Sequence, residues 1–300
     1  LGNVTVYGFS SQEEMHERTA DADVLIINKM LANAYTLEKA SHLKLICVAA
    51  TGTNNLDKDY LAQRGIAWRN VAGYSTECVT QHTFAMLFYL LEKLPYYDQY
   101  VKSEAYVDNT TFTHFSNVFH ELCGMTWGII GLGAIGQRVA QVASAFGCHV
   151  IYYSASGQHD HSDYERVSFD ELLSRSDIVS VHAPLTDRTE GLMNRKAFRK
   201  MKKSAIFLNL GRGPIIVEQD LADALQAGEL AAAGLDVLSA EPMKADNPLK
   251  CIKDSGRLII TPHIAWAGAE TRRRLMDIIW HQIQTFFDTE QASNQNVSES

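Results

Sequence analysis

Short apolar runs alternate with polar-patterned stretches along the first 70 residues. The runs at residues 4–6, 24–27, 43–48 and 66–68 predict strands, and the segments 12–19, 37–40 and 57–63 predict helices between them. This βαβ rhythm is typical of a parallel sheet covered by helices. Residues 76–99 contain no glycine and only one proline, Pro95, and their apolar positions recur near helical spacing. We expect one long helix to end this region.

A second βαβ series follows an irregular segment. Residues 102–124 have no period but are aromatic, so we expect this arm to bury itself against another surface, such as a second subunit. Six strands are then expected near residues 127–130, 149–153, 178–182, 205–209, 232–237 and 258–261, and residues 269–287 predict one terminal helix. The fold class is therefore α/β, with two doubly wound parallel-sheet domains: residues 1–99 with 268–300, and residues 100–267.

Composition narrows the class of protein. Of 300 residues, 46% are hydrophobic and 21% are charged, and the apolar runs are shorter than the roughly 18 residues of a membrane span. Twenty-seven basic against 35 acidic residues give a net charge of −8, which disfavours a nucleic-acid partner. Five scattered cysteines without a C-x-x-C pair suit reduced thiols in the cytoplasm and disfavour a zinc or disulfide scaffold.

A glycine motif opens the second series. Gly131, Gly133 and Gly136 follow a buried apolar run and precede an amphipathic segment, in the pattern G-x-G-x-x-G. Gly131 allows a tight turn, Gly133 lets the backbone approach a pyrophosphate, and Gly136 lets helix and strand pack closely. This context predicts a dinucleotide site, with the phosphates on helix N–H groups.

The expected acid for the ribose 2′-hydroxyl is missing. The second strand ends in Ser154, and no arginine lies between Ser154 and Arg166 to receive a 2′-phosphate. Asp160 and Asp163 nearby would repel such a phosphate. We therefore favour NAD, with NADP as the alternative.

Charged side chains follow three of the expected strands. Arg212 lies between two glycines after one strand, Glu241 follows the next, and His263 ends the third. Ligands of open α/β sheets bind at the carboxyl ends of strands. A guanidinium binds a carboxylate, and a glutamate beside a histidine favours the imidazolium, which can protonate a carbonyl oxygen as hydride arrives from a nicotinamide. No metal is needed for this chemistry.

Together these motifs resemble the D-isomer-specific 2-hydroxyacid dehydrogenases. The resemblance spans nearly the whole chain and rests on residues 131–136, 209–213, 234–237 with Glu241-Pro242, and 261–266. It implies that Arg212 binds the substrate carboxylate, that His263 is the general acid/base and that Glu241 orients it. It also implies a flavodoxin-like substrate domain (residues 1–99 and 268–300), a Rossmann NAD(P)-binding domain (residues 100–267) and a homodimer built by the arm.

The resemblance implies further contacts. Thr51, Gly52 and Thr53 would cradle the substrate carboxylate, with Tyr74 nearby and Trp266 walling the substrate. Asp236 would hold the nicotinamide carboxamide. The full set expected to contact the cofactor is Thr80, Gly131, Gly133, Ala134, Ile135, Gly136, Ser154, His182, Ala183, Pro184, Leu210, Gly211, Arg212, Asp236 and His263.

Side chains also bear on the choice of substrate. Residues 49–57 contain no Arg or Lys, which disfavours a phosphorylated acid. Formate dehydrogenases resemble this fold but carry Gln where Glu241 stands. The stretches ATGTNN, GYST and TPHIAW are most similar to glycerate dehydrogenases, also called hydroxypyruvate reductases. Hydroxypyruvate and D-glycerate are thus the leading pair, ahead of glyoxylate and of pyruvate with lactate.

Two other interpretations compete. Transcriptional corepressors share this fold and use the dinucleotide as a sensed ligand, but the chain has neither a linker-rich tail nor a basic patch to support that role. Residues 159–163 (HDHSD) could form a metal site if they lay on a strand. We favour a solvated loop there.

Overall fold

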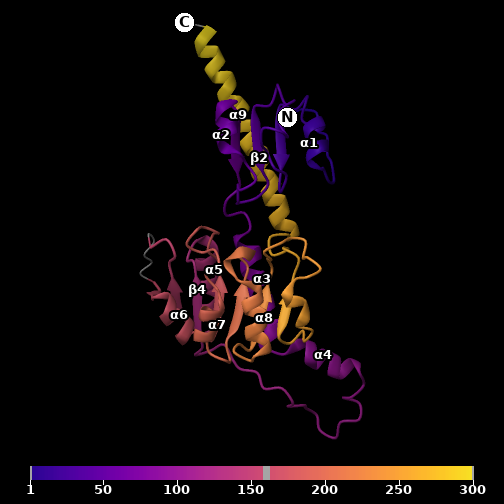
Figure 1. Cartoon of the computed structure of the whole chain (residues 1–300), viewed down its shortest axis with the longest axis vertical. Coiled ribbons are helices and arrows are strands. Elements are labelled where there is room, and N and C mark those ends of the chain that lie inside the picture. Colours follow the sequence, from indigo (N-terminus) through magenta and orange to yellow (C-terminus); the bar gives the residue numbers. More distant parts are fainter. Residues whose placement is uncertain (1, 158–162, 299–300) are drawn as a thin grey trace. The chain divides into compact units, whose positions relative to one another are not determined.

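The computed structural model describes residues 2–157 and 163–298, so the HDHSD stretch lies almost wholly outside the described residues. The chain divides into two compact units (Figure 1): a first unit of Leu1–Tyr74 with Ala269–Ser300, and a second unit of Ser75–Gly268. The first boundary falls at residue 75, whereas the sequence pattern placed it at residue 100. Helix α3 (Thr76–Leu91) accounts for this difference, because it packs against the sheet of the second unit.

The first unit is built on three parallel strands in the order β1 (Val24–Ile27), β2 (Leu45–Val48), β3 (Ala67–Asn70). Its helices are α1 (Gln12–Arg18), α2 (Lys58–Gln63) and α9 (Ala269–Ser298), the last of which contacts β2. The strand expected at residues 4–6 is wrong. Val4 is 81% exposed and pairs with no strand of the described chain, so no sheet stabilises an extended β-rich run there.

The second unit contains a seven-stranded parallel sheet. Its strands are β4 (Thr126–Ile130), β5 (His149–Tyr153), β6 (Glu165–Arg166), β7 (Ile178–Val181), β8 (Ile206–Asn209), β9 (Ala232–Leu235) and β10 (Leu258–Ile260). They lie in the order β10-β9-β8-β7-β4-β5-β6, so the chain builds outward from β4 first on one side and then on the other. This is a doubly wound sheet, and the six expected strands are confirmed. The two-residue β6 had not been expected.

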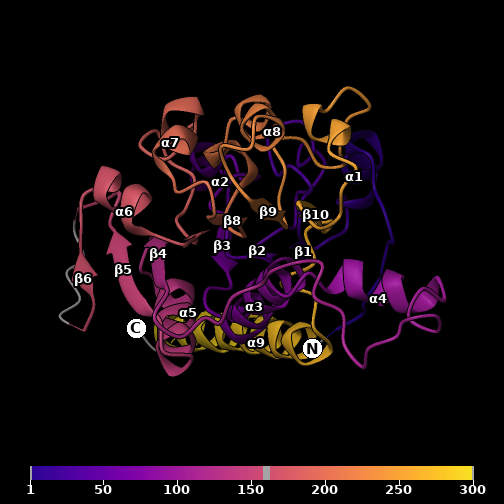
Figure 2. The same ribbon diagram turned by 90° about the horizontal axis from the view of Figure 1, so that it is seen from below.

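Helices cover both faces of this sheet. They are α3, α5 (Ala134–Ala145), α6 (Phe169–Arg175), α7 (Arg195–Lys200) and α8 (Glu218–Gln226), and the connections also contain the 3₁₀ turns η1 (Gly213–Ile215) and η2 (Pro248–Cys251). Helix α4 (Leu94–Lys102) contacts α3 and buries none of its own residues. Figure 2 shows α6, α7 and α8 on one face and α3 and α5 on the other. Accordingly, Phe207 of β8 joins one buried cluster, while Ile206 and Leu208 join the other. Two covered faces explain why these strands are continuously apolar.

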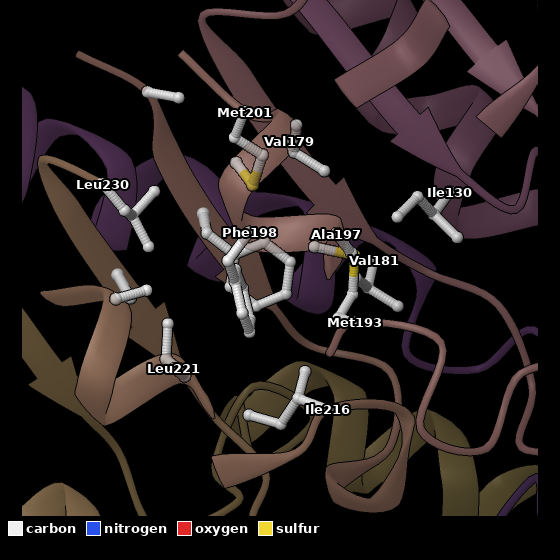
Figure 3. Close-up of a cluster of buried hydrophobic side chains, with 14 of the residues drawn as sticks. Ile130, Val179, Val181, Met193, Ala197, Phe198, Met201, Ile216, Leu221 and Leu230 are labelled. Atoms are coloured by element: carbon white, nitrogen blue, oxygen red, sulfur yellow. The ribbon is translucent and has the colours of Figure 1, made fainter. Parts of the chain in front are cut away.

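The cluster under α7 and α8 is centred on Phe198. Figure 3 shows its ring among Met193, Ile216, Leu221 and Leu230, all at most 3% exposed. Phe198 also meets Phe207 edge to face, with ring centroids 5.5 Å apart. This packing anchors the loops after β7 and β8, which carry residues of the site.

The single helix expected over residues 76–99 is two helices. α3 ends at Leu91, and α4 begins at Leu94 after Lys93 adopts a left-handed conformation with φ +54°. Pro95 lies in the first turn of α4, where its missing N–H is tolerated, whereas the interior of a continuous helix would not accept it. Across residues 2–157 and 163–298, no helix is both long and apolar enough to span a membrane.

Candidate active site

The glycine loop joins β4 to α5 and is shaped by close approaches. Gly131 has φ +93°, and a Cβ there would lie 2.7 Å from the Cα atom of Ala183, beyond β7. A Cβ at Gly136 would overlap the carbonyl oxygen of Gly131. At Gly133, by contrast, a Cβ would meet no described atom within 4 Å. The first and third glycines are therefore required by packing, whereas the second borders open space.

The start of α5 suits an anion. Gly133 is its N-cap, and no side chain caps the helix there. Ala134, Ile135 and Gly136 form its first turn, whose N–H groups have no partner within the helix. A helix N-terminus of this kind binds phosphate groups.

Two buried polar atoms of the second unit lack a hydrogen-bond partner among the described residues. They are Oγ1 of Thr80, in the first turns of α3, and Nδ1 of His182, directly after β7. Burial lowers the pKa of His182 to about 3, so its ring is neutral at physiological pH. Both residues were expected to contact the cofactor. Buried polar groups are nearly always hydrogen-bonded in native proteins, so these orphaned atoms fit a polar ligand at this site.

The end of β5 carries a serine and faces two arginines. Ser154 Oγ accepts a hydrogen bond from Gly157 N at 3.2 Å. Arg166 in β6 donates to Gly157 O, and Arg188 in the loop after β7 donates to Ser156 O, each at 3.3 Å. Two cations from separate elements therefore meet the loop at residues 154–157. Arg188 had no assigned role in the sequence.

The loop after β8 holds Arg212 in a rigid frame. Asn209, which is fully buried, donates from Nδ2 to Arg212 O (3.0 Å), and its Oδ1 accepts from Gly211 N (3.1 Å). A Cβ at Gly213 would overlap the carbonyl group of Leu238. The loop that carries Arg212 is therefore packed directly on the loop after β9.

His263 and Glu241 form a close pair. Nδ1 of His263 lies 2.7 Å from Oε2 of Glu241, and Oε1 of Glu241 accepts a hydrogen bond from Leu238 N at 3.0 Å. Leu238 thus contacts both the Arg212 loop and the carboxylate that holds the histidine. Arg212, Glu241 and His263 come from loops after three neighbouring strands, β8, β9 and β10, at the carboxyl end of one sheet.

Asp236 organises the loop that carries His263. Its side chain is 2% exposed, and Oδ1 accepts hydrogen bonds from Thr261 Oγ1 (2.6 Å) and Ile264 N (2.9 Å). Oδ2 accepts from Ala265 N (2.9 Å). The backbone oxygen of Asp236 accepts from His263 N, which has φ +56°. The side-chain hydrogen bonds observed for Asp236 are therefore to this loop, a role that the sequence did not suggest.

The other residues expected to bind substrate or cofactor differ in their burial. In the first unit, Thr51 Oγ1 donates to Val71 O (3.1 Å), Gly52 and Thr53 are half-buried, and Tyr74 is buried. In the second unit, Trp266 is half-buried, Ala183 and Leu210 are buried, and Pro184 is exposed.

Sequence reasoning missed Asn209, Thr261 and His82 as structural partners of the site. A usable signal existed for His82, because it is a polar residue on a helix between the buried residues Val79 and Thr83. Nothing in the linear pattern indicated its partner, Thr261, 179 positions away.

Similarity to known proteins agrees with this geometry. Residues 84–265 match the profile of the "D-isomer specific 2-hydroxyacid dehydrogenase, NAD binding domain" family. A hydroxypyruvate reductase of Blautia hydrogenotrophica is 40% identical over 291 residues, covering 95% of this chain and 89% of the relative.

Solved structures give the same result. A D-lactate dehydrogenase from Aquifex aeolicus, complexed with NAD and lactic acid, superposes with a TM-score of 0.80 at 29% identity, covering 92% of this chain and 86% of its own. An acyclic imino acid reductase, Bsp5, in complex with NADPH and D-Arg, gives 0.84 at 29% identity, with coverage of 95% and 89%. The chain belongs to the D-isomer-specific 2-hydroxyacid dehydrogenase family and is a nicotinamide-dinucleotide-dependent oxidoreductase.

Proposed function

We propose that this protein reversibly reduces a small 2-oxo acid to the D-2-hydroxy acid, with hydroxypyruvate and D-glycerate as the leading pair. The observation that supports this proposal most directly is the contact of 2.7 Å between His263 Nδ1 and Glu241 Oε2. The loops that form this contact also pack against the loop that carries Arg212. The 40% identity to a hydroxypyruvate reductase supports the substrate. The absence of Arg and Lys from residues 49–57 supports an unphosphorylated acid.

Each member of the trio has one task in this proposal. Arg212 binds the substrate carboxylate, since a guanidinium can pair with it through two hydrogen bonds. Glu241 occupies Nδ1 of His263, which leaves Nε2 as the atom that gives a proton to the carbonyl oxygen or takes it back. A dinucleotide bound at the glycine loop would supply or accept the hydride. Following the family resemblance, we also assign substrate binding to Thr51, Gly52, Thr53, Tyr74 and Trp266.

The cofactor is held by the glycine loop and the orphaned polar atoms. Gly133 leaves room for the pyrophosphate at the start of α5, and Thr80 Oγ1 and His182 Nδ1 offer unused hydrogen-bonding capacity. Among the described residues, Oδ2 of Asp236 accepts a hydrogen bond from Ala265 N, which leaves a second acceptor position on that oxygen for the carboxamide.

The end of β5 favours acceptance of NADPH as well as NADH. No acid stands at Ser154 to select the ribose 2′-hydroxyl, and Arg166 and Arg188 bring two positive charges to the same loop.

A homodimer is part of the proposal. The arm at residues 102–124 exposes Phe112 (91%), Phe115 (85%) and Val118, while its His114 ring stacks on Tyr100 of α4 with centroids 3.8 Å apart. A second copy of the arm would cover Phe112, Phe115 and Val118. All five cysteines are free thiols, which supports a cytoplasmic location.

Oxidation of the two glycerate enantiomers tests the proposed reaction. With NAD or NADP as oxidant, we expect D-glycerate to be oxidised and L-glycerate to be inert, and hydroxypyruvate to give a higher kcat/KM than glyoxylate or pyruvate in the reverse direction. Oxidation of L-glycerate alone would contradict the proposal. Dinucleotide binding without turnover of any acid would favour the sensor interpretation.

A further inference from the structure

A histidine outside the proposed trio is bonded to the loop that carries His263. Nε2 of His82, on α3, lies 3.0 Å from Oγ1 of Thr261, directly after β10. We propose that His82 is a positioning residue of the active site: acting through Thr261 and Asp236, it fixes the loop that presents His263. This proposal rests on the proposed function and adds a residue that contacts neither substrate nor cofactor.

The directions of these hydrogen bonds follow from the donors available. Asp236 is buried and, as a carboxylate, can only accept, so the single proton of the Thr261 hydroxyl points to Oδ1, 2.6 Å away. The Thr261 oxygen must then accept from His82, which places the His82 proton on Nε2. The same Nε2 lies 3.6 Å from Oδ1 of Asp236, so the ring also faces the carboxylate. Hydrogen bonds arranged in such a chain polarise and strengthen one another.

The far end of the chain is the backbone of the catalytic loop. Asp236 receives N–H groups from Ile264 and Ala265, and its own carbonyl receives the N–H of His263. His263 sits at φ +56°, a left-handed conformation that is unfavourable for a non-glycine residue. These bonds hold it there. If the chain is weakened at His82, we expect the loop to relax and the His263 ring to spend less time in the productive orientation.

Helix α3 is a firm base for this support. Val79, Thr83 and Met86 are buried on the same helix, and α3 packs on β8 and β9. The His82 side chain is 20% exposed, and its Nε2 is already engaged. The hydrogen bond between His82 and Thr261 therefore fixes the loop after β10 relative to helix α3.

Two substitutions at one position separate the hydrogen bond from simple packing. His82→Leu removes the donor at similar size, whereas His82→Gln can place an amide N–H where Nε2 stands. We expect H82L to lower kcat about tenfold, with the KM of the oxo acid and the cofactor affinity changed less than about threefold, and H82Q to retain most of kcat. Gln81→Leu, the same replacement at an exposed neighbour on α3, is the control and should match the parent. Thr261→Val should give the H82L phenotype, and the double variant should be no worse than T261V alone.

A measurement without substrate keeps this test independent of the proposed reaction. Heteronuclear NMR of the imidazole nitrogens should find the proton of His82 on Nε2, and amide hydrogen exchange at Ile264 and Ala265 should be about tenfold faster in H82L than in H82Q. A proton on Nδ1, equal exchange in the two variants, or additive effects of H82L and T261V would overturn the role of His82. If the parent turns over no 2-oxo acid but the exchange result holds, the proposed function fails while the support of the loop stands.

Discussion

At the residue scale, the site depends on a few positions where backbone and side chain are both constrained. His263 combines a left-handed backbone with a ring held 2.7 Å from Glu241. Gly213 is required because any side chain there would overlap the carbonyl group of Leu238. The sequence motifs indicated Arg212, Glu241 and His263, because parallel strands place their carboxyl ends at one edge. The support from Asp236 and Thr261 could not be predicted, since it depends on how the loop folds back on its own strand.

Arg212 and His263 should differ in their kinetic signatures. Arg212→Ala removes the carboxylate anchor, so we expect KM for the oxo acid to rise and kcat to fall. His263→Ala removes the proton donor and should lower kcat by roughly 10²–10⁴-fold with a smaller effect on KM. Steady-state assays of both proteins check this. Parental kinetics in either variant would remove the role assigned to that residue.

Two glycines offer a matched pair. Gly133→Ala adds a methyl group where no described atom lies within 4 Å, so we expect the free energy of unfolding to change by less than about 1 kcal/mol while dinucleotide affinity falls. Gly213→Ala inserts the same group against the backbone of Leu238 and should destabilise the fold by roughly 1–3 kcal/mol. Urea unfolding and calorimetric titration with NADH separate the two effects. A G133A protein with full cofactor affinity would contradict the placement of the pyrophosphate.

At the element scale, periodicity was a good guide to the strands of the second unit and a poorer one to the end of helix α3 and to the start of the chain. The six strands that it predicted there have covered faces, so their sequences are distinctive. The break at Lys93 was missed because only Pro95 signalled it. Residues 4–6 have a β-like sequence, but a strand also needs a neighbour, and the described chain provides none.

The loop after β5 should control the choice of cofactor. Ser154→Asp introduces a carboxylate beside the proposed 2′-position, so we expect NADPH use to fall about tenfold or more while NADH use is kept. Arg188→Ala should also weaken NADPH selectively. Titration with 2′,5′-ADP and with 5′-AMP reports this without turnover. Equal NADPH affinity in S154D and the parent would show that the 2′-group lies elsewhere.

At the scale of the whole molecule, one half-buried histidine, His182, should make stability depend on pH. The pKa of His182 is about 3 in the folded protein, below its ordinary value of about 6.5, so the unfolded chain binds a proton that the folded chain does not. The contribution of His182 to the free energy of unfolding is therefore fully present above about pH 7. It falls as the pH decreases, by at most about 1.4 kcal/mol per pH unit. Urea midpoints at about pH 7 and pH 5 should show a smaller loss in His182→Asn than in the parent. His281→Asn, at an exposed position, should show the parental loss.

Assembly should depend on the aromatic arm. Phe112 and Phe115 are almost fully exposed, and replacing both with Ser leaves the stacked ring of Tyr100 on His114 untouched. We expect the parent to sediment as a dimer and the double variant as a monomer at the same concentration. A parent that sediments as a monomer would exclude this role for the arm.

The most direct test of the proposed function is to mix the protein with NADH or NADPH and hydroxypyruvate, and to follow the loss of reduced-nicotinamide absorbance. We predict rapid oxidation of the cofactor with accumulation of D-glycerate. If a folded, dinucleotide-binding protein left the absorbance unchanged with hydroxypyruvate, glyoxylate and pyruvate alike, the account of Arg212, Glu241 and His263 as a reductase site would be wrong.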